Sequence, residues 1–130
     1  NAMEKSGLVA SISQMIVPDP KALSPVMVLL ILYVMTNVAT ELITNNAAAV
    51  LMFPFAVRFA DDLGAHPMPF VMAVTVAASA AFALPLGYQT HLMVYGPGGY
   101  KLGDFLRVGV LMDIIICACA VTLIPLVWKF

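Results

Sequence analysis

Two long apolar runs constrain the fold of this chain more than any other feature. Pro25 to Ile43 and Val108 to Trp128 each approach the roughly 20 apolar residues that a helix needs to cross a bilayer. Only 10% of the 130 residues are charged, whereas roughly a quarter of an average soluble domain is charged. So few charges cannot cover the surface of a soluble domain. The sequence therefore predicts an all-α membrane protein.

Charge and cysteine content exclude several classes of partner. The formal net charge is −1, and the six Lys and Arg residues are scattered, so we expect no nucleic-acid partner and no polybasic lipid-binding patch. Cys117 and Cys119 are the only cysteines and lie inside an apolar run. A C-x-C pair with no nearby His is a poor metal site, so we interpret both as small apolar residues of a helix.

The beginning of the chain predicts a helix on the membrane surface. Residues 1–3 are expected to be the remnant of a cleaved tag followed by a start Met, with no signal peptide. If Met3 is the start, the natural protein is either truncated here or short. In residues 4–17, apolar side chains recur at helical spacing, at Leu8, Ile12, Met15 and Ile16. The segment is too short and too polar to span, which predicts an interfacial helix.

Residues 25–60 predict a re-entrant helical hairpin. The first apolar run ends in crowded polar residues, namely Asn37, Thr40, Glu41, Thr44, Asn45 and Asn46. Unpaired polar groups cost several kcal/mol in hydrocarbon, so these must face protein, water or an ion. Ala47 to Ala60 is apolar but short, as re-entrant segments are. We expect a non-helical tip at Thr44 to Asn46; the alternative is one long helix kinked near Pro54.

Residues 67–99 predict a discontinuous transmembrane helix. The apolar run that ends at Leu84 is followed by Pro85 and Gly87, which remove a helical hydrogen bond and loosen the backbone. We expect the interruption to extend from Pro85 to Thr90, before a short apolar piece from Leu92 to Tyr95. Residues 104–129 predict a final transmembrane helix with aromatic and basic anchors at its end.

The loops predict an orientation in the membrane. Loop 96–107 carries Lys101 and Arg107 against a single acidic residue, and loop 58–67 carries Arg58 against two. The positive-inside rule therefore places loop 96–107 in the cytoplasm and loop 58–67 outside.

A polar hairpin tip followed by a broken helix suggests an ion and substrate site. Secondary transporters bind their substrates where helices are interrupted. An unwound turn frees carbonyl groups that can coordinate sodium, and a helix N-terminus offers N–H groups and a positive dipole end to an anion.

At these positions the chain resembles a known family. Thr40-Glu41-Leu42-Ile43-Thr44-Asn45-Asn46-Ala47 resembles the second Ser-Asn-Thr motif of the divalent anion:sodium symporters, the sodium-coupled sulfate and dicarboxylate carriers. Ala78-Ser79-x-x-Phe82-x-x-Pro85-Leu86-Gly87-x-x-x-His91-x-Met93-Val94 resembles that family's signature. The segments 95–100 and 105–109 resemble bacterial members described as sulfate permeases, and the resemblance runs from Pro25 to the C-terminus.

The resemblance implies part of a transporter built from two inverted repeats. The chain would supply the second hairpin, the second broken helix and the last helix, and the N-terminal repeat would be its missing partner. The full-length protein would be a homo-oligomeric, sodium-coupled symporter of sulfate or of di- and tricarboxylates in the bacterial inner membrane. It would not be an enzyme, would need no cofactor, and would use sodium as its coupling ion.

The resemblance also implies which residues bind each ligand. Sodium would be bound by Thr44, Asn45, Pro85, Gly87 and Thr90. The anion would be bound by Asn45 and Asn46. This chain has Thr44 where the motif has Ser and Asn46 where it has Thr, which favours sulfate over a carboxylate. His91 replaces an Asn and would tune the site. Glu41 is either a pathway carboxylate or a locally paired structural residue.

Other classes remain open at the level of the sequence. One is a small helical membrane protein that assembles with a partner without transport of its own, and another is a related arsenite or sodium/proton antiporter. Asp113, inside the last apolar run, would snorkel, pair across helices or face a cavity. Gly103-Asp104 faintly resembles the motif of intramembrane aspartyl proteases, but Asp113 lacks the second motif that those enzymes need.

Overall fold

The computed structural model describes residues 7–19, 22–85 and 89–130. Within these residues the chain forms α-helices joined by short connections, as the sequence predicts. They are α2 (Leu8–Ile16), α3 (Pro25–Leu42), α4 (Asn45–Leu63), α5 (Met68–Ser79), α6 (Gln89–Tyr95) and α7 (Leu102–Val127).

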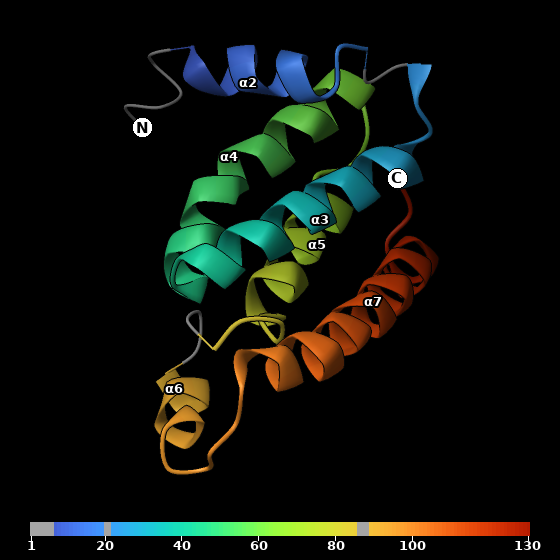
Figure 1. Ribbon diagram of the computed structural model, residues 1–130. Helices are drawn as coiled ribbons and strands as arrows, with labels where there is room; N and C mark the ends of the chain where they lie inside the picture. The colour runs from blue at the N-terminus through green and yellow to red at the C-terminus, as the bar shows by residue number, and fades with distance from the viewer. Residues whose placement is uncertain (1–6, 20–21, 86–88) are drawn as a thin grey trace.

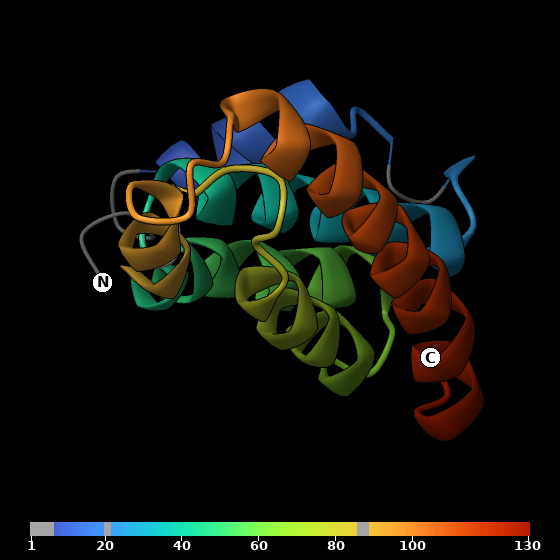
Figure 2. The same ribbon diagram turned by 60° about the horizontal axis from the view of Figure 1, so that its bottom comes forward.

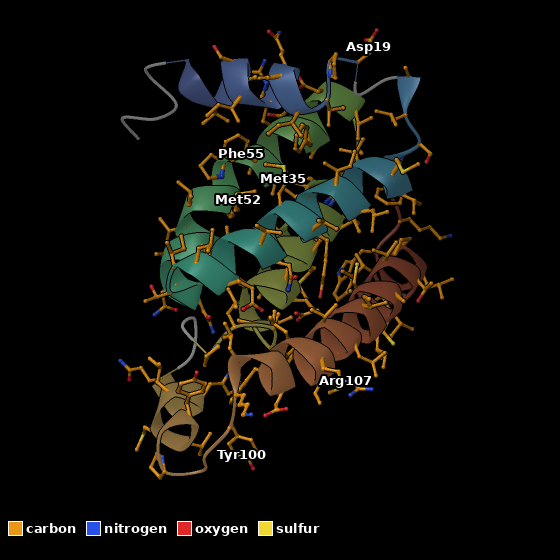
Figure 3. All side chains as sticks on the ribbon, in the orientation of Figure 1. Asp19, Met35, Met52, Phe55, Tyr100 and Arg107 are labelled. Atoms are coloured by element: carbon orange, nitrogen blue, oxygen red, sulfur yellow. The ribbon has the colours of Figure 1, made fainter. Side chains whose placement is uncertain are left out.

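The helices α3, α4 and α5 pack against one another, and α7 crosses α3 and α5 (Figure 1). The core between them is apolar: Leu29, Phe59 and Phe70 are fully buried. Figure 3 shows Met35 of α3 beside Met52 and Phe55 of α4, where the two helices meet. The α3–α4 turn, the break after α5 and α6 lie at one end of this bundle, and α2 lies across the other end (Figures 1 and 2).

By length and composition, α3 and α7 are candidate membrane spans. They differ in environment, because 39% of the residues in the most apolar stretch of α3 are buried but only 11% of those in α7. Large apolar side chains therefore cover the outer surface of α7, among them Leu111, Ile114 and Leu126. A helix with so much exposed apolar surface is typical of contact with lipid or with another apolar helix.

The predicted hairpin is present as two separate helices, and its boundaries need correction. α3 ends at Leu42 and α4 begins at Asn45, so the single kinked helix is wrong. α4 is 19 residues long, longer than the predicted apolar segment, and passes through Pro54 without ending. It ends at Leu63, and the next residue, Gly64, has a φ of 64°, the left-handed conformation common after a helix. The path of the hairpin through a membrane stays a prediction.

The helix predicted within residues 4–17 is present as α2, and only part of its apolar stripe faces the bundle, because Ile16 packs against the core. Val9, Ser13 and Val17 are buried, whereas Ile12 and Met15 are exposed. α2 contacts α4, and Ile12 and Met15 point away from the bundle. This arrangement leaves an apolar surface for a membrane interface, which stays a prediction.

The predicted broken helix is interrupted earlier than expected. α5 ends at Ser79 rather than at Leu84, and α6 begins at Gln89, so the prediction that Thr90 lies in the interruption is wrong. The final helix begins at Leu102, two residues before the predicted start at 104, and ends at Val127. Its first turn is capped because the Lys101 backbone N–H donates to Asp104 Oδ2 at 2.9 Å.

Candidate functional site

One face of α3 carries the polar side chains that organise the break after α5. Asn37, Thr40 and Glu41 are spaced by three and four residues, so they share one helix face. Thr40 is fully buried and Glu41 is only 7% exposed. Each of the three makes a hydrogen bond to the backbone between Ala78 and Leu84. The chain crosses this face as it leaves α5 (Figure 2).

Glu41 holds the middle of the break. Its Oε1 accepts from the Ala83 backbone N–H at 2.8 Å, and its Oε2 accepts from the Leu84 backbone N–H at 2.6 Å. Hydrogen bonds to an ionised acceptor are stronger than neutral ones. Both N–H groups lie beyond the end of α5, where no helix partner satisfies them. The structure therefore shows Glu41 paired with the backbone of the break, and its role as a pathway carboxylate stays a prediction.

Thr40 connects the hairpin tip to the end of α5. Its Oγ1 lies 2.8 Å from the Ala78 carbonyl oxygen and 3.0 Å from Asn45 Oδ1. A hydroxyl has one proton, so Thr40 donates to one of these oxygens at a time. If the Asn45 amide is rotated so that its NH₂ faces Thr40, both contacts are satisfied at once. In that orientation, Thr40 ties the first residue of α4 to the last turn of α5.

Asn37 extends this network to the last helix. Its Nδ2 donates to the Ala80 carbonyl, and it lies 3.5 Å from Asp113 Oδ1. Asp113 is only 9% exposed, and it both contacts Asn37 of another helix and lines a cavity between α3 and α7. The network therefore joins α3, the break and α7.

Gly109 allows α7 to approach the break closely. A Cβ at this position would lie 2.0 Å from the Phe82 carbonyl oxygen and 2.6 Å from Ala83 Cα, both of them backbone atoms. Only glycine fits such an approach. In the sequence, Gly109 stood out only within a segment of family resemblance, because the contact joins parts of the chain that are distant in sequence.

The hairpin tip is smaller than predicted. Thr44 is the N-cap of α4, and its Oγ1 accepts from the Ala47 backbone N–H at 3.4 Å. Asn45 and Asn46 are the first helical residues, so the prediction of a non-helical tip through Asn46 is wrong. The physical reason is that threonine is a favourable N-cap, which allows the helix to start directly after it. Asn45 is half-buried, and Asn46 is exposed.

The remaining predicted site residues are less closely grouped. Pro85 is buried in the break, and Gly87 lies outside the described residues. Thr90 is exposed in α6, and across the described ranges no hydrogen bond ties it to the hairpin tip. The His91 ring lies 5.9 Å from that of Phe105, between α6 and the start of α7. The structure thus brings the tip and the first half of the break together, with α6 at the same end of the bundle.

This arrangement places a helix N-terminus beside an unwound backbone segment. The start of α4 offers N–H groups and a positive dipole end, and the end of α5 offers carbonyl groups. Interrupted helices within a bundle that has apolar spans are typical of helical membrane transporters. The fold and the arrangement of the site are therefore those expected of a helical membrane transporter.

Comparison with known proteins supports the same class of membrane transporter. The sequence model of a family described as the sodium:sulfate symporter transmembrane region matches residues 1–130. The chain belongs to this family, as its motifs suggested, and is part of an integral membrane protein.

Several relatives carry the same segment. An uncharacterised transporter of Synechocystis is 42% identical over 127 residues, 98% of this chain and 21% of the relative. Sodium/sulfate cotransporter 1 of Chlamydomonas reinhardtii is 38% identical over 109 residues, 83% of this chain and 12% of the relative. Solute carrier family 13 member 2 of the mouse is 32% identical over 112 residues, 86% of this chain and 19% of the relative. The chain thus spans about a fifth or less of the length of these relatives.

Proposed function

We propose that this chain is the C-terminal part of a sodium-coupled symporter for divalent anions and contributes half of its sodium and anion site. The observation that carries the proposal is the hydrogen-bonded link from Asn45 through Thr40 to the Ala78 carbonyl. It joins the hairpin tip to the break, the two features that the family resemblance associates with the site. A relative named sodium/sulfate cotransporter supports sulfate as the first anion to test.

For sodium, we propose the side chains of Thr44 and Asn45 together with backbone groups at Pro85, Gly87 and Thr90. Sodium is a hard cation and favours oxygen ligands, as other hard cations do. Thr44 Oγ1 and Asn45 Oδ1 are neutral oxygens at the start of α4. Residues 80–85 have left the helical conformation, so their carbonyl groups are free of helical bonds.

For the anion, we propose Asn45 and Asn46. Both lie in the first turn of α4, where backbone N–H groups lack helical acceptors and the dipole favours negative charge. The Asn46 side chain is exposed at this end of the bundle, so its amide N–H can reach a sulfate or carboxylate oxygen. His91 would tune the site from α6.

The membrane setting completes the proposal. We place residues 96–107, which include the start of α7, in the cytoplasm and residues 58–67, which include the end of α4, outside a bacterial inner membrane. In this setting α3 and α4 form a re-entrant hairpin and α2 lies at the interface. The exposed apolar face of α7 fits a position against lipid or a further helix. The N-terminal repeat of the same transporter would supply the other half of the site, and the complete protein would be a homo-oligomer.

The experiment is uptake of labelled sulfate into proteoliposomes that contain the full-length transporter, with and without an inward sodium gradient. Uptake that needs the gradient supports the proposal. Sodium release coupled to protons, or arsenite movement, would indicate the related antiporters. No solute movement by a folded protein would favour an assembly role without transport.

Two variants test the separate roles at the start of α4. Asn45→Ala removes the neutral oxygen proposed for sodium, so it should raise the sodium concentration needed for half-maximal uptake. Asn46→Thr should leave that concentration nearly unchanged and shift the ratio of sulfate to dicarboxylate uptake. Equal effects of both variants on sodium and anion dependence would overturn the assignment.

A further inference from the structure

A long apolar groove lies between α3 and α7, the two candidate membrane spans (Figure 1). Its volume is about 710 Å³, and its walls are mostly aliphatic. The lining residues run from Leu30 to Leu42 on α3 and from Leu106 to Thr122 on α7. These stretches are about 18–24 Å long at 1.5 Å for each helical residue, which is most of the roughly 30 Å hydrocarbon core of a bilayer. The groove therefore has the length and direction of a further membrane helix.

Asp113 lies halfway along the α7 wall of this groove. It is 9% exposed, and none of the Lys and Arg residues that the structure describes forms an ion pair with it. Its contact with the Asn37 amide is long, at 3.5 Å. A carboxylate in the middle of a membrane span is costly unless a cation or several donors compensate its charge.

Tyr33 adds a second unsatisfied group to the same groove. It is 1% exposed, and within the described ranges its hydroxyl has no hydrogen-bond partner. Nearly all buried polar groups in folded proteins have a partner, so this hydroxyl needs one from outside the described residues. A carboxylate only accepts hydrogen bonds, and a hydroxyl can accept one as well as donate. A basic side chain placed in the groove would therefore supply donors to both residues.

Two other occupants fit these polar groups less well. A lipid acyl chain has no hydrogen-bonding group, so it would leave Asp113 and Tyr33 unsatisfied. The spans of a second copy also lack a suitable donor, because α3 contains no Lys or Arg and α7 contains only Arg107, close to its start. Of the Synechocystis, Chlamydomonas and mouse relatives, more than three quarters of the length lies outside the matched segment. A further membrane helix has ample room in that length.

We propose that the groove is the docking site of a transmembrane helix from another part of the same full-length protein, and that this helix places a Lys or Arg side chain beside Asp113 and Tyr33. The apolar face of the helix packs against the aliphatic walls, and its basic side chain forms an ion pair with the Asp113 carboxylate. Such a buried pair fixes the register of the helix against α3 and α7. The proposal rests on the chain being part of a longer membrane protein and not on sodium or anion transport.

The first test is photo-crosslinking of the full-length protein in proteoliposomes, with a benzophenone amino acid in place of Val38. This residue lines the groove and is 55% exposed. Mass spectrometry of the monomeric product should identify an apolar segment from outside these 130 residues that contains a Lys or Arg. Ile115 is the matched control, because it is 49% exposed and lies two residues from Asp113 but does not line the groove.

The identity of the adduct decides the occupant. An adduct of the Val38 position with lipid, with a second copy or with a segment that lacks Lys and Arg would overturn the proposal. The same adduct from Val38 and Ile115 would also overturn it, because a helix seated in the groove cannot reach both positions.

Tyr33→Phe tests the hydroxyl by the direction of a shift in the unfolding temperature of the full-length protein in detergent. Removal of a hydroxyl that is bonded to a docked side chain should lower this temperature. Removal of an unsatisfied hydroxyl should leave it unchanged or raise it, and that result would overturn the proposal. Tyr100→Phe makes the same change at a side chain that is 53% exposed, and it should have little effect.

Asp113→Asn tests the ion pair in the same assay. The variant keeps an oxygen that can accept from Asn37, but it leaves the proposed basic side chain without a counter-charge. The unfolding temperature should therefore fall by a few degrees or more, whereas Asp61→Asn, at an exposed site of α4, should leave it nearly unchanged. An unchanged or higher temperature in Asp113→Asn would show that no basic side chain pairs with Asp113.

If Asp113→Asn does not fold, the cross-link from Val38 still decides, because that protein keeps Asp113 and Tyr33. These measurements also separate the two proposals. A protein that forms the expected cross-link and shows both shifts, but does not take up sulfate, would refute the proposed function alone.

Discussion

The contact between Gly109 and the break gives the sharpest test of the structure. In an ordinary helix, replacing glycine by alanine stabilises the helix by up to about 1 kcal/mol. At Gly109 the new Cβ would lie 2.0 Å from the Phe82 carbonyl oxygen. The two backbones would have to separate by about 1 Å or more to restore ordinary van der Waals contact. Such separation would also lengthen the contact of Asn37 with Asp113, which is already 3.5 Å.

Overpacking of this kind costs about 1–3 kcal/mol, and backbone atoms yield less readily than a flexible side chain. We therefore expect Gly109→Ala to destabilise the protein by about 1–2 kcal/mol after the gain in helix propensity is subtracted. The assay is thermal unfolding of the full-length protein in detergent. Gly103→Ala is the matched control in the same helix, because a Cβ there meets nothing within 4 Å. Equal unfolding temperatures for the two variants would refute the close approach of α7 to the break.

Two further predictions concern polar contacts of different burial. Glu41→Gln keeps one acceptor but turns an NH₂ group toward the N–H of Ala83 or Leu84, so it should destabilise the protein by about 1–3 kcal/mol in the same assay. Wild-type stability of this variant would contradict the role of Glu41 at the break. Arg58→Ala removes a contact of 3.3 Å between side chains that are 41% and 33% exposed, and such surface pairs contribute about 0–1 kcal/mol. A loss as large as that of Glu41→Gln would show that Arg58 has another partner.

Local signals in the sequence were sufficient to predict much of the fold. The apolar runs predicted α3 and α7, because length and hydropathy are enough to recognise candidate spans. The polar cluster that begins at Asn37 predicted the turn between α3 and α4. The resemblance of the two sequence motifs predicted the family. These features depend on residues that are close in the sequence.

The start of the break could not be predicted in the same way. Ala80 to Leu84 is composed of residues that favour or tolerate a helix, and the recognisable helix breakers begin at Pro85. The helix ends early because Asn37, Thr40 and Glu41 bind the backbone from Ala78 onward. Those partners lie about forty residues away in sequence, so no local pattern reveals them. The same holds for Gly109, whose neighbour is the backbone of Phe82.

The dependence of the break on α3 has a consequence for how the protein is made. Residues 68–84 have no strong reason of their own to leave the helical conformation. During synthesis and membrane insertion, this segment would first be a straight helix that extends beyond Ser79. It would open only after α3 docks and Glu41 captures the N–H groups of Ala83 and Leu84. The interruption would then form late in folding, and its position would depend on the earlier placement of α3.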